Sequence, residues 1–233
     1  MGSPKKVHGV DFLDRSGFWM EDNVFSYREC DNLINAVPHS LQGRSRAGAR
    51  NLMSITAIEA AAKDERLLRI ARRSLGDGAV AFRATLFDKS ARANWLVVWH
   101  QDTALPLESR NDLAEWGPWS MKAGILYARA PAWALSRVLA LRISLDASTN
   151  KNGPLRVIPG SHLGGVLSGD EIHELARARE KVDALVPRGE VLAMRPLLIH
   201  SSSKSLSNEP RRVLHIEYAD TLDLGPGLRL AIA

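Results

Sequence analysis

Two residues of types that commonly bind metals, His100 and Asp102, follow the apolar stretch 95–99. Side chains at positions i and i+2 leave a β-strand on the same face, so both could reach one ion. An imidazole and a carboxylate that leave coordination positions open are typical of ferrous iron in oxygenases. The pair does not define a metal site without further ligands, because His-x-Asp sequences also recur by chance.

A second histidine, His200, follows another apolar stretch, 197–199, and precedes three serines. With His100 and Asp102 it would supply two imidazoles and one carboxylate. Such a triad leaves positions for a bidentate cosubstrate and for dioxygen. The alternative is a structural histidine that hydrogen-bonds to the backbone, which is the commoner role of a lone histidine.

Arg211 comes eleven residues after His200. If the turn 205–210 joined two antiparallel strands, Arg211 would lie near His200. A guanidinium can hold a carboxylate with two parallel hydrogen bonds, as a cosubstrate with a carboxylate at its far end requires. Strand alternation places His215 on the same face as Arg211. The alternative for the adjacent arginines is an exposed strand edge, which fits Arg212 better than Arg211.

The elements that must position these residues begin with helices. Ser26 and Glu29 form a capping box for a first helix. The stretch 54–75 predicts a second helical region. Residues 1–17 are expected to form a flexible tail, which leaves 18–78 as a helical flank.

From residue 79 onward the sequence predicts short strands, at 79–88, 94–99, 121–129, 138–147, 155–158, 184–186, 190–194, 197–201, 211–220 and 228–232. The stretch 103–118 is expected to be a long loop beside the site, and 170–180 an amphipathic helix. The sequence has no βαβ alternation and no glycine-rich phosphate loop. These features predict one domain over residues 1–233, with an all-β barrel or sandwich over 79–233 and helices packed outside.

The composition narrows the class of protein. The chain has 233 residues, of which 45% are hydrophobic, and its single cysteine excludes an internal disulfide and a cysteine-rich zinc site. The sequence has no apolar stretch of transmembrane length and no evident secretory signal, so we expect a cytoplasmic protein without membrane partners. The net charge of +5 is dispersed, so we expect no nucleic-acid partner. The densest basic group, Arg44, Arg46 and Arg50, could face solvent or an anionic substrate.

Several segments together resemble the phytanoyl-CoA dioxygenase (PhyH) family: His100-Gln101-Asp102, the stretch 152–162, His200-Ser201-Ser202, and Arg211. The resemblance covers roughly residues 18–220 in order. It implies a mainly β fold, a double-stranded β-helix (a jelly-roll, cupin-like core) with flanking α-helices. It also implies a non-haem Fe(II) enzyme that uses 2-oxoglutarate as cosubstrate together with O2.

The resemblance assigns the metal ligands by position. His100, Asp102 and His200 match the residues that bind iron. Halogenases of this family carry a small residue in place of the carboxylate, so Asp102 favours oxygenation over halogenation. His162, in the Pro-Gly-Ser-His stretch, is expected to order its loop, because three ligands are already assigned.

The resemblance also assigns cosubstrate contacts. Arg211 matches the arginine that holds the far carboxylate of 2-oxoglutarate. Ser202 lies where several members place a hydroxyl on that same carboxylate. The strand that begins at residue 79 matches one that supplies a polar cosubstrate contact, and its candidates are Arg83 and Lys89.

Arg142 is a departure from the family pattern. Some members carry a tryptophan beside the cosubstrate at the position that we align with it. A buried arginine there could contact the cosubstrate or an anionic substrate. The alternative is a structural ion pair, for instance with Asp146 or Glu217.

The reaction implied by the resemblance is oxidation, by default hydroxylation, of an unactivated C–H bond with release of succinate and CO2. Desaturation, cyclisation and demethylation stay open. The expected substrate is a small metabolite or natural-product intermediate, and the protein a monomer or homodimer. Candidate substrate contacts are Trp116, Trp119, Arg50 and Lys122, with core packing as the alternative for the tryptophans.

Three other functions are compatible with parts of the pattern. One is a non-catalytic small-molecule-binding protein on the same barrel. Another is an oxygenase that acts on an acyl-CoA or a carrier-bound substrate, although the chain has no obvious insert for either. The third is a nucleic-acid-associated oxygenase, which the dispersed basic charge disfavours.

Overall fold

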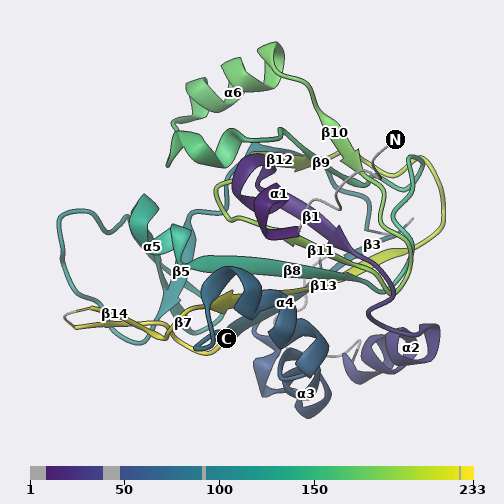
Figure 1. Cartoon of the computed structure of the whole chain (residues 1–233), viewed down its shortest axis with the longest axis horizontal. Coiled ribbons are helices and arrows are strands. Elements are labelled where there is room, and N and C mark those ends of the chain that lie inside the picture. The colour runs from purple at the N-terminus through teal and green to yellow at the C-terminus, as the bar shows by residue number, and fades with distance from the viewer. Residues whose placement is uncertain (1–8, 39–47, 91–92, 226) are drawn as a thin grey trace, which may run out of the picture.

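The computed structural model describes residues 9–38, 48–90, 93–225 and 227–233, and two facing antiparallel sheets form its centre (Figure 1). The strands of the larger sheet are β1 Phe18–Glu21, β2 Gly48–Ala49, β3 Val80–Lys89, β8 Val138–Ser144, β11 Val191–Met194 and β13 Arg211–Ala219. The strands of the smaller sheet are β4 Val97–His100, β9 Leu155–Val157, β10 Val182–Ala184 and β12 His200–Ser202. The strand order is β1-β11-β8-β13-β3-β2 in the larger sheet and β10-β9-β12-β4 in the smaller one. The predicted double-stranded β-helix is therefore confirmed.

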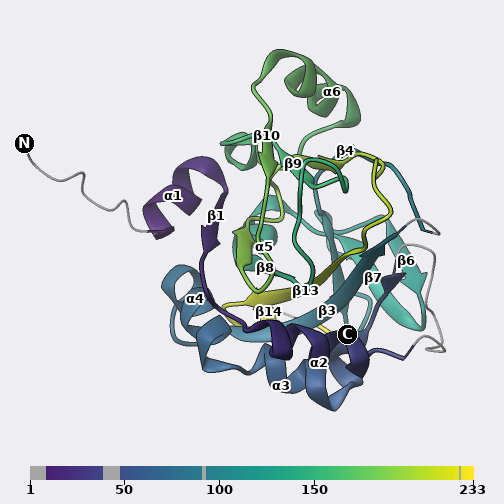
Figure 2. The same ribbon diagram turned by 90° about the vertical axis from the view of Figure 1, so that its right-hand side faces the viewer.

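Other strands and the helices surround this core. A three-stranded sheet holds β5 Ala104–Leu107, β6 Trp119–Lys122 and β7 Ile125–Arg129, and a two-stranded sheet holds β14 Asp223–Gly225 and β15 Leu228–Arg229. The helices are α1 Gly9–Ser16, α2 Tyr27–Ala36, α3 Thr56–Ala62, α4 Glu65–Leu75, α5 Ala132–Ser136 and α6 Gly169–Ala178, with short 3₁₀ turns η1 Leu52–Ser54 and η2 Ser161–Gly164. Figure 2 shows α2, α3 and α4 on one side of the larger sheet and α6 beside the smaller sheet. No helix in the described ranges has both the length and the apolar character needed to cross a membrane.

Alternation along β13 explains how the larger sheet serves both the core and the site. Leu214, Ile216 and Tyr218 belong to the main hydrophobic core, to which α2, α3 and α4 also contribute. Arg211 and His215 lie on the opposite face, because successive side chains of a strand point to opposite sides. The apolar face therefore packs against the helices, and the polar face lies inside the barrel.

Residues 9–16, within the stretch expected to be a tail, form α1. The expectation is wrong for this part of the chain because Leu13 is fully buried in the main core. The amide of Gly160 donates to the carbonyl of Ser16 over 2.9 Å, which connects α1 to the loop after β9. Residues 1–8 lie outside the described residues.

The two predicted helical regions before the barrel are confirmed. Ser26 and Glu29 form both hydrogen bonds of the capping box at the start of α2. The region 54–75 is divided among the end of η1, α3 and α4, and the side chain of Asp64 caps α4 by accepting a hydrogen bond from a backbone amide.

The region between β4 and β8 differs most from the prediction. The expected loop 103–118 contains β5, which lies at the edge of its sheet. An edge strand tolerates Pro106, because the backbone N–H that proline lacks is not needed on the side without a neighbouring strand of the sheet. The expected strand 121–129 is a hairpin, β6 and β7, in which Lys122 faces Ile125. Its two turn residues have positive φ, 49° for Ala123 and 79° for the following glycine. Alanine is uncommon in this conformation, so the turn has no clear signal in the sequence.

Candidate metal and cosubstrate site

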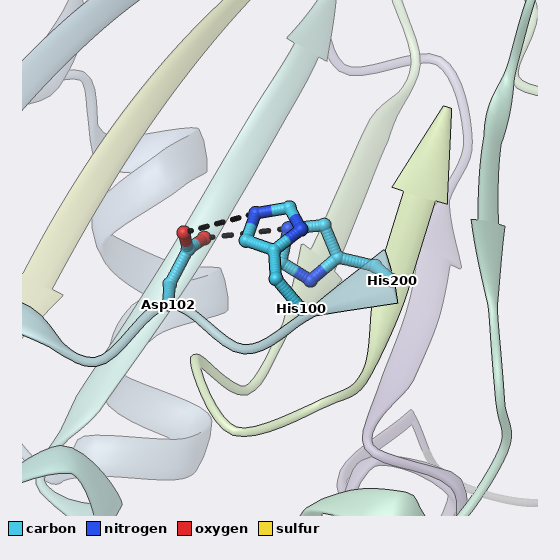
Figure 3. Close-up of side chains that lie close together, drawn as sticks. All are labelled: His100, Asp102 and His200. Atoms are coloured by element: carbon cyan, nitrogen blue, oxygen red, sulfur yellow. Dashed lines mark ion pairs between the residues drawn. The ribbon is translucent and has the colours of Figure 1, made fainter. Parts of the chain in front are cut away.

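Three candidate metal ligands meet at the edge of the smaller sheet. His100 ends β4 and His200 begins β12, and the two histidines face each other as antiparallel partners. The amide of Asp102 donates to the carbonyl of Pro196 over 2.9 Å, which holds the segment after β4 in place. Figure 3 shows the two imidazoles and the carboxylate pointing toward one another. Nε2 of His100 lies 3.7 Å from one Asp102 oxygen, and Nε2 of His200 lies 3.6 Å from the other.

Both imidazoles are oriented in the same way by the backbone. Nδ1 of His100 lies 2.8 Å from the carbonyl of Val98, and Nδ1 of His200 lies 2.8 Å from the carbonyl of Leu198. A carbonyl only accepts hydrogen bonds, so Nδ1 carries the proton and Nε2 presents a lone pair. Two lone pairs directed at a carboxylate repel it unless a cation lies among them. The arrangement therefore fits a metal ion bound by the three side chains.

The protonation states of the triad also fit a metal. Burial raises the pKa of Asp102, but the protonated forms of His200 and His100, together with His215 and Arg83, outweigh burial and hold this pKa far below its usual range. Burial lowers the pKa of His200 to about 4. At neutral pH the carboxylate is ionised and the imidazole of His200 is neutral, as metal ligation requires.

A second cluster, which we call the carboxylate anchor, consists of Lys89, Ser202 and Arg211. The Ser202 hydroxyl accepts hydrogen bonds from Lys89 Nζ at 2.7 Å and from Arg211 Nη2 at 3.3 Å. Lys89 and Arg211 face each other on β3 and β13, and only 1% and 3% of their surfaces are exposed. Among the described residues no carboxylate pairs with either cation. Buried cations without a counter-ion are costly, so the anchor fits an anionic ligand.

Backbone carbonyls of the stretch 149–154 hold two side chains of the anchor in place. The carbonyl of Gly153 accepts a hydrogen bond from the Ser202 hydroxyl at 2.8 Å, and the carbonyl of Asn152 accepts one from Arg211 Nε at 3.3 Å. Gly153 has φ of +66°, and a Cβ there would lie 2.3 Å from the carbonyl oxygen of Ser203. Only glycine allows this close approach. The Asn-Gly-Pro segment of the family pattern therefore positions the anchor.

One expected route to this geometry is wrong. β12 and β13 belong to different sheets, so Arg211 is not on a strand paired with that of His200. It reaches Ser202 from the opposite sheet, across the interior of the barrel. The separation of eleven residues thus spans a crossing between sheets and not a hairpin.

Two cavities adjoin the triad and share Asp102 and Phe87. The smaller cavity, of about 70 Å³, is lined by both histidines of the triad and by residues of the anchor, with Arg142 in its wall. The larger cavity, of about 250 Å³, lies on the other side and is lined by Arg83, Tyr127 and other polar residues. Asp102 therefore lines both a cavity that contains residues of the anchor and a cavity that does not.

The remaining cosubstrate candidates divide between these cavities. Lys89 belongs to the anchor, but Arg83 lines the larger cavity and not the smaller one, and it forms an ion pair with Glu217. Arg142 lines the smaller cavity, and its Nη1 lies 2.9 Å from Nδ1 of His215. The alternative ion pairs of Arg142 are not formed, because Glu217 pairs with Arg83 and Asp146 pairs with Arg212.

The candidate substrate contacts also divide. Arg50 and Lys122 line the larger cavity. Trp116 is buried in a separate core cluster, where it packs edge-on against Trp133 with ring centroids 6.1 Å apart. Trp119 packs beside the same cluster and lines neither cavity. The core-packing alternative therefore describes both tryptophans.

Some residues of the site are not among the candidates that the sequence predicts. His215 and Tyr127 line the larger cavity, and Gln101 fixes the loops around it. The Gln101 amide donates to the carbonyls of Gly165 and Leu197, both at 2.8 Å. For His215 a signal existed, since strand alternation placed it on the face of Arg211. For Tyr127 the sequence gives no such signal, because the stretch 121–129 predicts a single strand and not the hairpin that carries this residue.

His162 lies away from the triad, as expected. Its Nε2 lies 3.2 Å from the carbonyl of Asp14 in α1. The residue therefore connects η2 to the N-terminal helix.

Two imidazoles and one carboxylate inside a double-stranded β-helix form a ligand set that is typical of mononuclear non-haem Fe(II) oxygenases. The phytanoyl-CoA dioxygenase (PhyH) family model matches residues 14–213. The chain belongs to this family of Fe(II)- and 2-oxoglutarate-dependent oxygenases.

Individual proteins are similar to this chain in sequence or in fold. The chain is 28% identical over 178 residues to L-proline trans-4-hydroxylase of Streptomyces griseoviridis, and the match covers 65% of this chain and 59% of the hydroxylase. It therefore spans less than two thirds of that relative. AviO1 of Streptomyces viridochromogenes Tue57 has a similar fold, with a TM-score of 0.66, 20% identity, and coverage of 99% of this chain and 100% of that chain. EctD of S. alaskensis, solved with 2-oxoglutarate and 5-hydroxyectoine, gives a TM-score of 0.68 at 23% identity, covering 90% of this chain and 74% of that chain.

Proposed function

We propose that this protein hydroxylates an unactivated C–H bond of a small molecule in an Fe(II)- and 2-oxoglutarate-dependent reaction. The observation that carries the proposal is the shared cavity of the triad and the anchor. Three side chains suited to iron and two buried cations suited to a carboxylate line or adjoin the same small compartment. A binding protein without catalysis could use the cations for an anionic ligand but would not need the metal triad.

In this proposal each side chain of the site has a defined task. His100 and His200 bind iron through Nε2, and Asp102 supplies the third ligand. Arg211, Lys89 and the Ser202 hydroxyl hold the far carboxylate of 2-oxoglutarate. The positive charges of the anchor offset the charge of that carboxylate, and the buried position excludes water from it.

Iron with bound 2-oxoglutarate would supply the oxidising chemistry, in which O2 and 2-oxoglutarate give succinate and CO2 as a C–H bond becomes C–OH. One oxygen atom enters succinate and the other enters the product. Because Asp102 occupies the third ligand position, we propose oxygenation and not halogenation. The hydroxylase relative supports hydroxylation over desaturation, cyclisation or demethylation.

The proposed substrate is a small metabolite, such as an amino acid or a natural-product intermediate. The relative that is named for proline hydroxylation supports this class. The larger cavity of about 250 Å³ is below the usual range of about 300–1,000 Å³ for sites that bind drug-sized molecules, which argues against a long acyl chain held inside it.

We also propose that the protein acts as a single domain, as a monomer or homodimer in the cytoplasm, without nucleic-acid partners. The buried single cysteine, Cys30, is compatible with a reducing compartment. Size-exclusion chromatography with light scattering measures the oligomeric state. A salt-dependent binding assay with DNA and RNA tests the absence of such partners.

An anaerobic titration tests the proposed function. Fe(II) followed by 2-oxoglutarate should produce the weak visible charge-transfer band of a chelated 2-oxo acid. Asp102→Ala should lack the band, and Arg211→Met should need a higher concentration of 2-oxoglutarate to form it. Absence of the band in the unmodified protein would contradict the proposal and favour a non-catalytic binding protein.

A screen for turnover follows from the same preparation. Small molecules that are substrates should increase the rate of succinate formation, and mass spectrometry should find a product heavier by one oxygen atom. A product lighter by two hydrogens would replace hydroxylation by desaturation without changing the assigned ligands.

A further inference from the structure

The larger cavity carries three cationic side chains, Arg50, Arg83 and Lys122. Glu217 pairs with Arg83 and compensates its charge. In the described ranges no carboxylate pairs with Arg50 or Lys122. Arg50 and Lys122 therefore face the cavity without an ion-pair partner in the described part of the chain, and Asp102, the carboxylate that lines the same cavity, is a candidate metal ligand.

These cations come from three separate segments that are held together by neighbouring residues. The Asn51 amide donates to the carbonyl of Ala123 at 3.4 Å, and the Tyr127 hydroxyl donates to the Asn51 side-chain oxygen at 3.5 Å. These contacts attach the segment of Arg50 to the hairpin that carries Lys122. Nζ of Lys122 lies 5.1 Å from the centroid of the Tyr127 ring, within range of a cation–π contact.

The same clustering affects the charge of Lys122. Partial desolvation by its neighbours lowers the pKa of Lys122, and repulsion from Arg50 and then Arg83 lowers it further, against an opposing attraction from Asp102. Like charges brought together in this way cost free energy in the empty protein. An anion bound between them would remove that cost.

The residues that line the larger cavity differ in their exposure to solvent. Arg50 and Lys122 are exposed, whereas Asp102 is partly buried and His215 is buried. Arg50 and Lys122 therefore lie at the mouth, and Asp102, the triad residue that lines this cavity, lies deeper. A molecule held by one end at the mouth would extend toward the metal.

We propose that Arg50 and Lys122 bind an anionic group of the substrate, a carboxylate or a phosphate, at the mouth of the larger cavity. This inference rests on the proposed oxygenase function, because the cavity adjoins the same Asp102. The substrate is then a small molecule with an anionic group at one end and the reacting C–H bond at the other. An apolar acyl chain offers no partner to these cations, so their charge does not favour its binding in this cavity.

Matched pairs of compounds test the inference. Free amino acids are compared with their C-terminal amides, and sugar phosphates with the unphosphorylated sugars. Binding is measured by calorimetry on the protein loaded anaerobically with Fe(II) and 2-oxoglutarate, and the charge-transfer band is recorded on the same samples. We expect the compounds that bind to carry the carboxylate or phosphate group, and their partners without that anionic group to bind about tenfold to a hundredfold more weakly. The amino-acid and sugar-phosphate arms distinguish a carboxylate from a phosphate.

Variants localise the effect. Arg50→Gln and Lys122→Gln should each raise the Kd, and the KM in turnover, of an anionic compound about tenfold and leave its amide or unphosphorylated partner unchanged. The matched controls are Arg72→Gln on α4 and Lys63→Gln after α3, each of which removes one cation of the same type that pairs with a glutamate outside the cavity. The double reversal Arg50→Glu with Lys122→Glu should abolish the preference for the anionic member of each pair.

The outcomes separate this inference from the proposed function. If the band forms but no anionic compound binds, or neutralised partners bind equally well, the anion site is refuted and the oxygenase is not. Unchanged Kd values in both single variants would refute it too. If the band is absent but calorimetry still shows the preference and its loss in the variants, the anion site stands and the oxygenase does not.

Discussion

Arg142 donates a hydrogen bond through Nη1 to Nδ1 of His215, over 2.9 Å, from the neighbouring strand of the larger sheet. A guanidinium has no acceptor, so Nδ1 of His215 accepts and Nε2 carries the only ring proton of the neutral imidazole. Burial, followed by repulsion from Arg142, holds the pKa of His215 well below its ordinary value. The relationship links the smaller cavity, which Arg142 lines, to the larger one, which His215 lines.

A double-mutant cycle measures this link. Arg142→Met and His215→Leu, singly and together, should show a coupling of about 1.5–3 kcal/mol in the free energy of unfolding, as expected for a buried hydrogen bond from a charged donor. Chemical denaturation provides the values. The control cycle pairs Arg142→Met with His173→Leu, an exposed residue on α6, and should show no coupling. A coupling below about 0.5 kcal/mol in the first cycle would contradict the hydrogen bond as a stabilising contact.

Metal binding should stabilise the protein through the triad. At a metal concentration of one hundred times Kd, a ligand that binds only the folded state adds about 2.7 kcal/mol. For a chain of this length that raises Tm by about 5–10 °C. Anaerobic thermal melts with Fe(II), before and after a chelator, should show the increase and its reversal.

Asp102→Asn is the informative variant for that measurement. Without metal its Tm should equal or exceed that of the unmodified protein, because the substitution removes a carboxylate that faces two imidazole lone pairs. With metal the increase in Tm should be lost, since removal of a direct ligand costs more than the roughly tenfold to hundredfold effect of an outer contact. Asp146→Asn, whose carboxylate pairs with Arg212, is the control that should retain the increase. An equal metal response in Asp102→Asn would remove Asp102 from the triad.

Binding of 2-oxoglutarate should depend on pH through Lys89. Burial, and then repulsion from Arg211, lowers the pKa of Lys89 to about 8. Below this pH Lys89 is protonated and attracts the far carboxylate, and above it the charge is lost. The KM for 2-oxoglutarate should therefore be constant below about pH 8 and rise above it, to a limit of about tenfold to a hundredfold.

Two substitutions separate Lys89 from other titrating groups. Lys89→Arg keeps the charge at every accessible pH, so the rise in KM above pH 8 should disappear. Lys89→Met should have a high KM at all pH values. A pH profile of the Lys89→Arg variant that matches the unmodified protein would assign the titration to another group.

The N-terminal helix should contribute to stability. Leu13 is fully buried, so Leu13→Ala should lower the free energy of unfolding by about 2–5 kcal/mol. Asp11→Ala, on the exposed side of the same helix, should change it by less than about 0.5 kcal/mol. Urea denaturation compares the two. Equal and small effects would mean that α1 does not pack on the core in solution.

Much of the site could be predicted because its residues stand in short, patterned segments. His100 and Asp102 share one strand end, and the histidine at position 200 follows a second apolar stretch; the structure brings all three together. Alternation also placed Arg211 and His215 on one face of β13. Local pattern is sufficient for such features, because the direction of a side chain on a strand depends on its neighbours in sequence.

The contacts that give each residue its partner depended on the assembled barrel. The pairing of Arg211 with Ser202 across two sheets, the pairing of Arg83 with Glu217, and the burial of Trp116 join segments far apart in the chain. The sequence does not predict the hairpin turn at Ala123, because alanine rarely adopts the positive φ that this turn requires. The hydrophobic period and the residue type predict which way a side chain points. The group that the side chain contacts depends on how the sheets pack, because long-range contacts form only when the chain closes around its core.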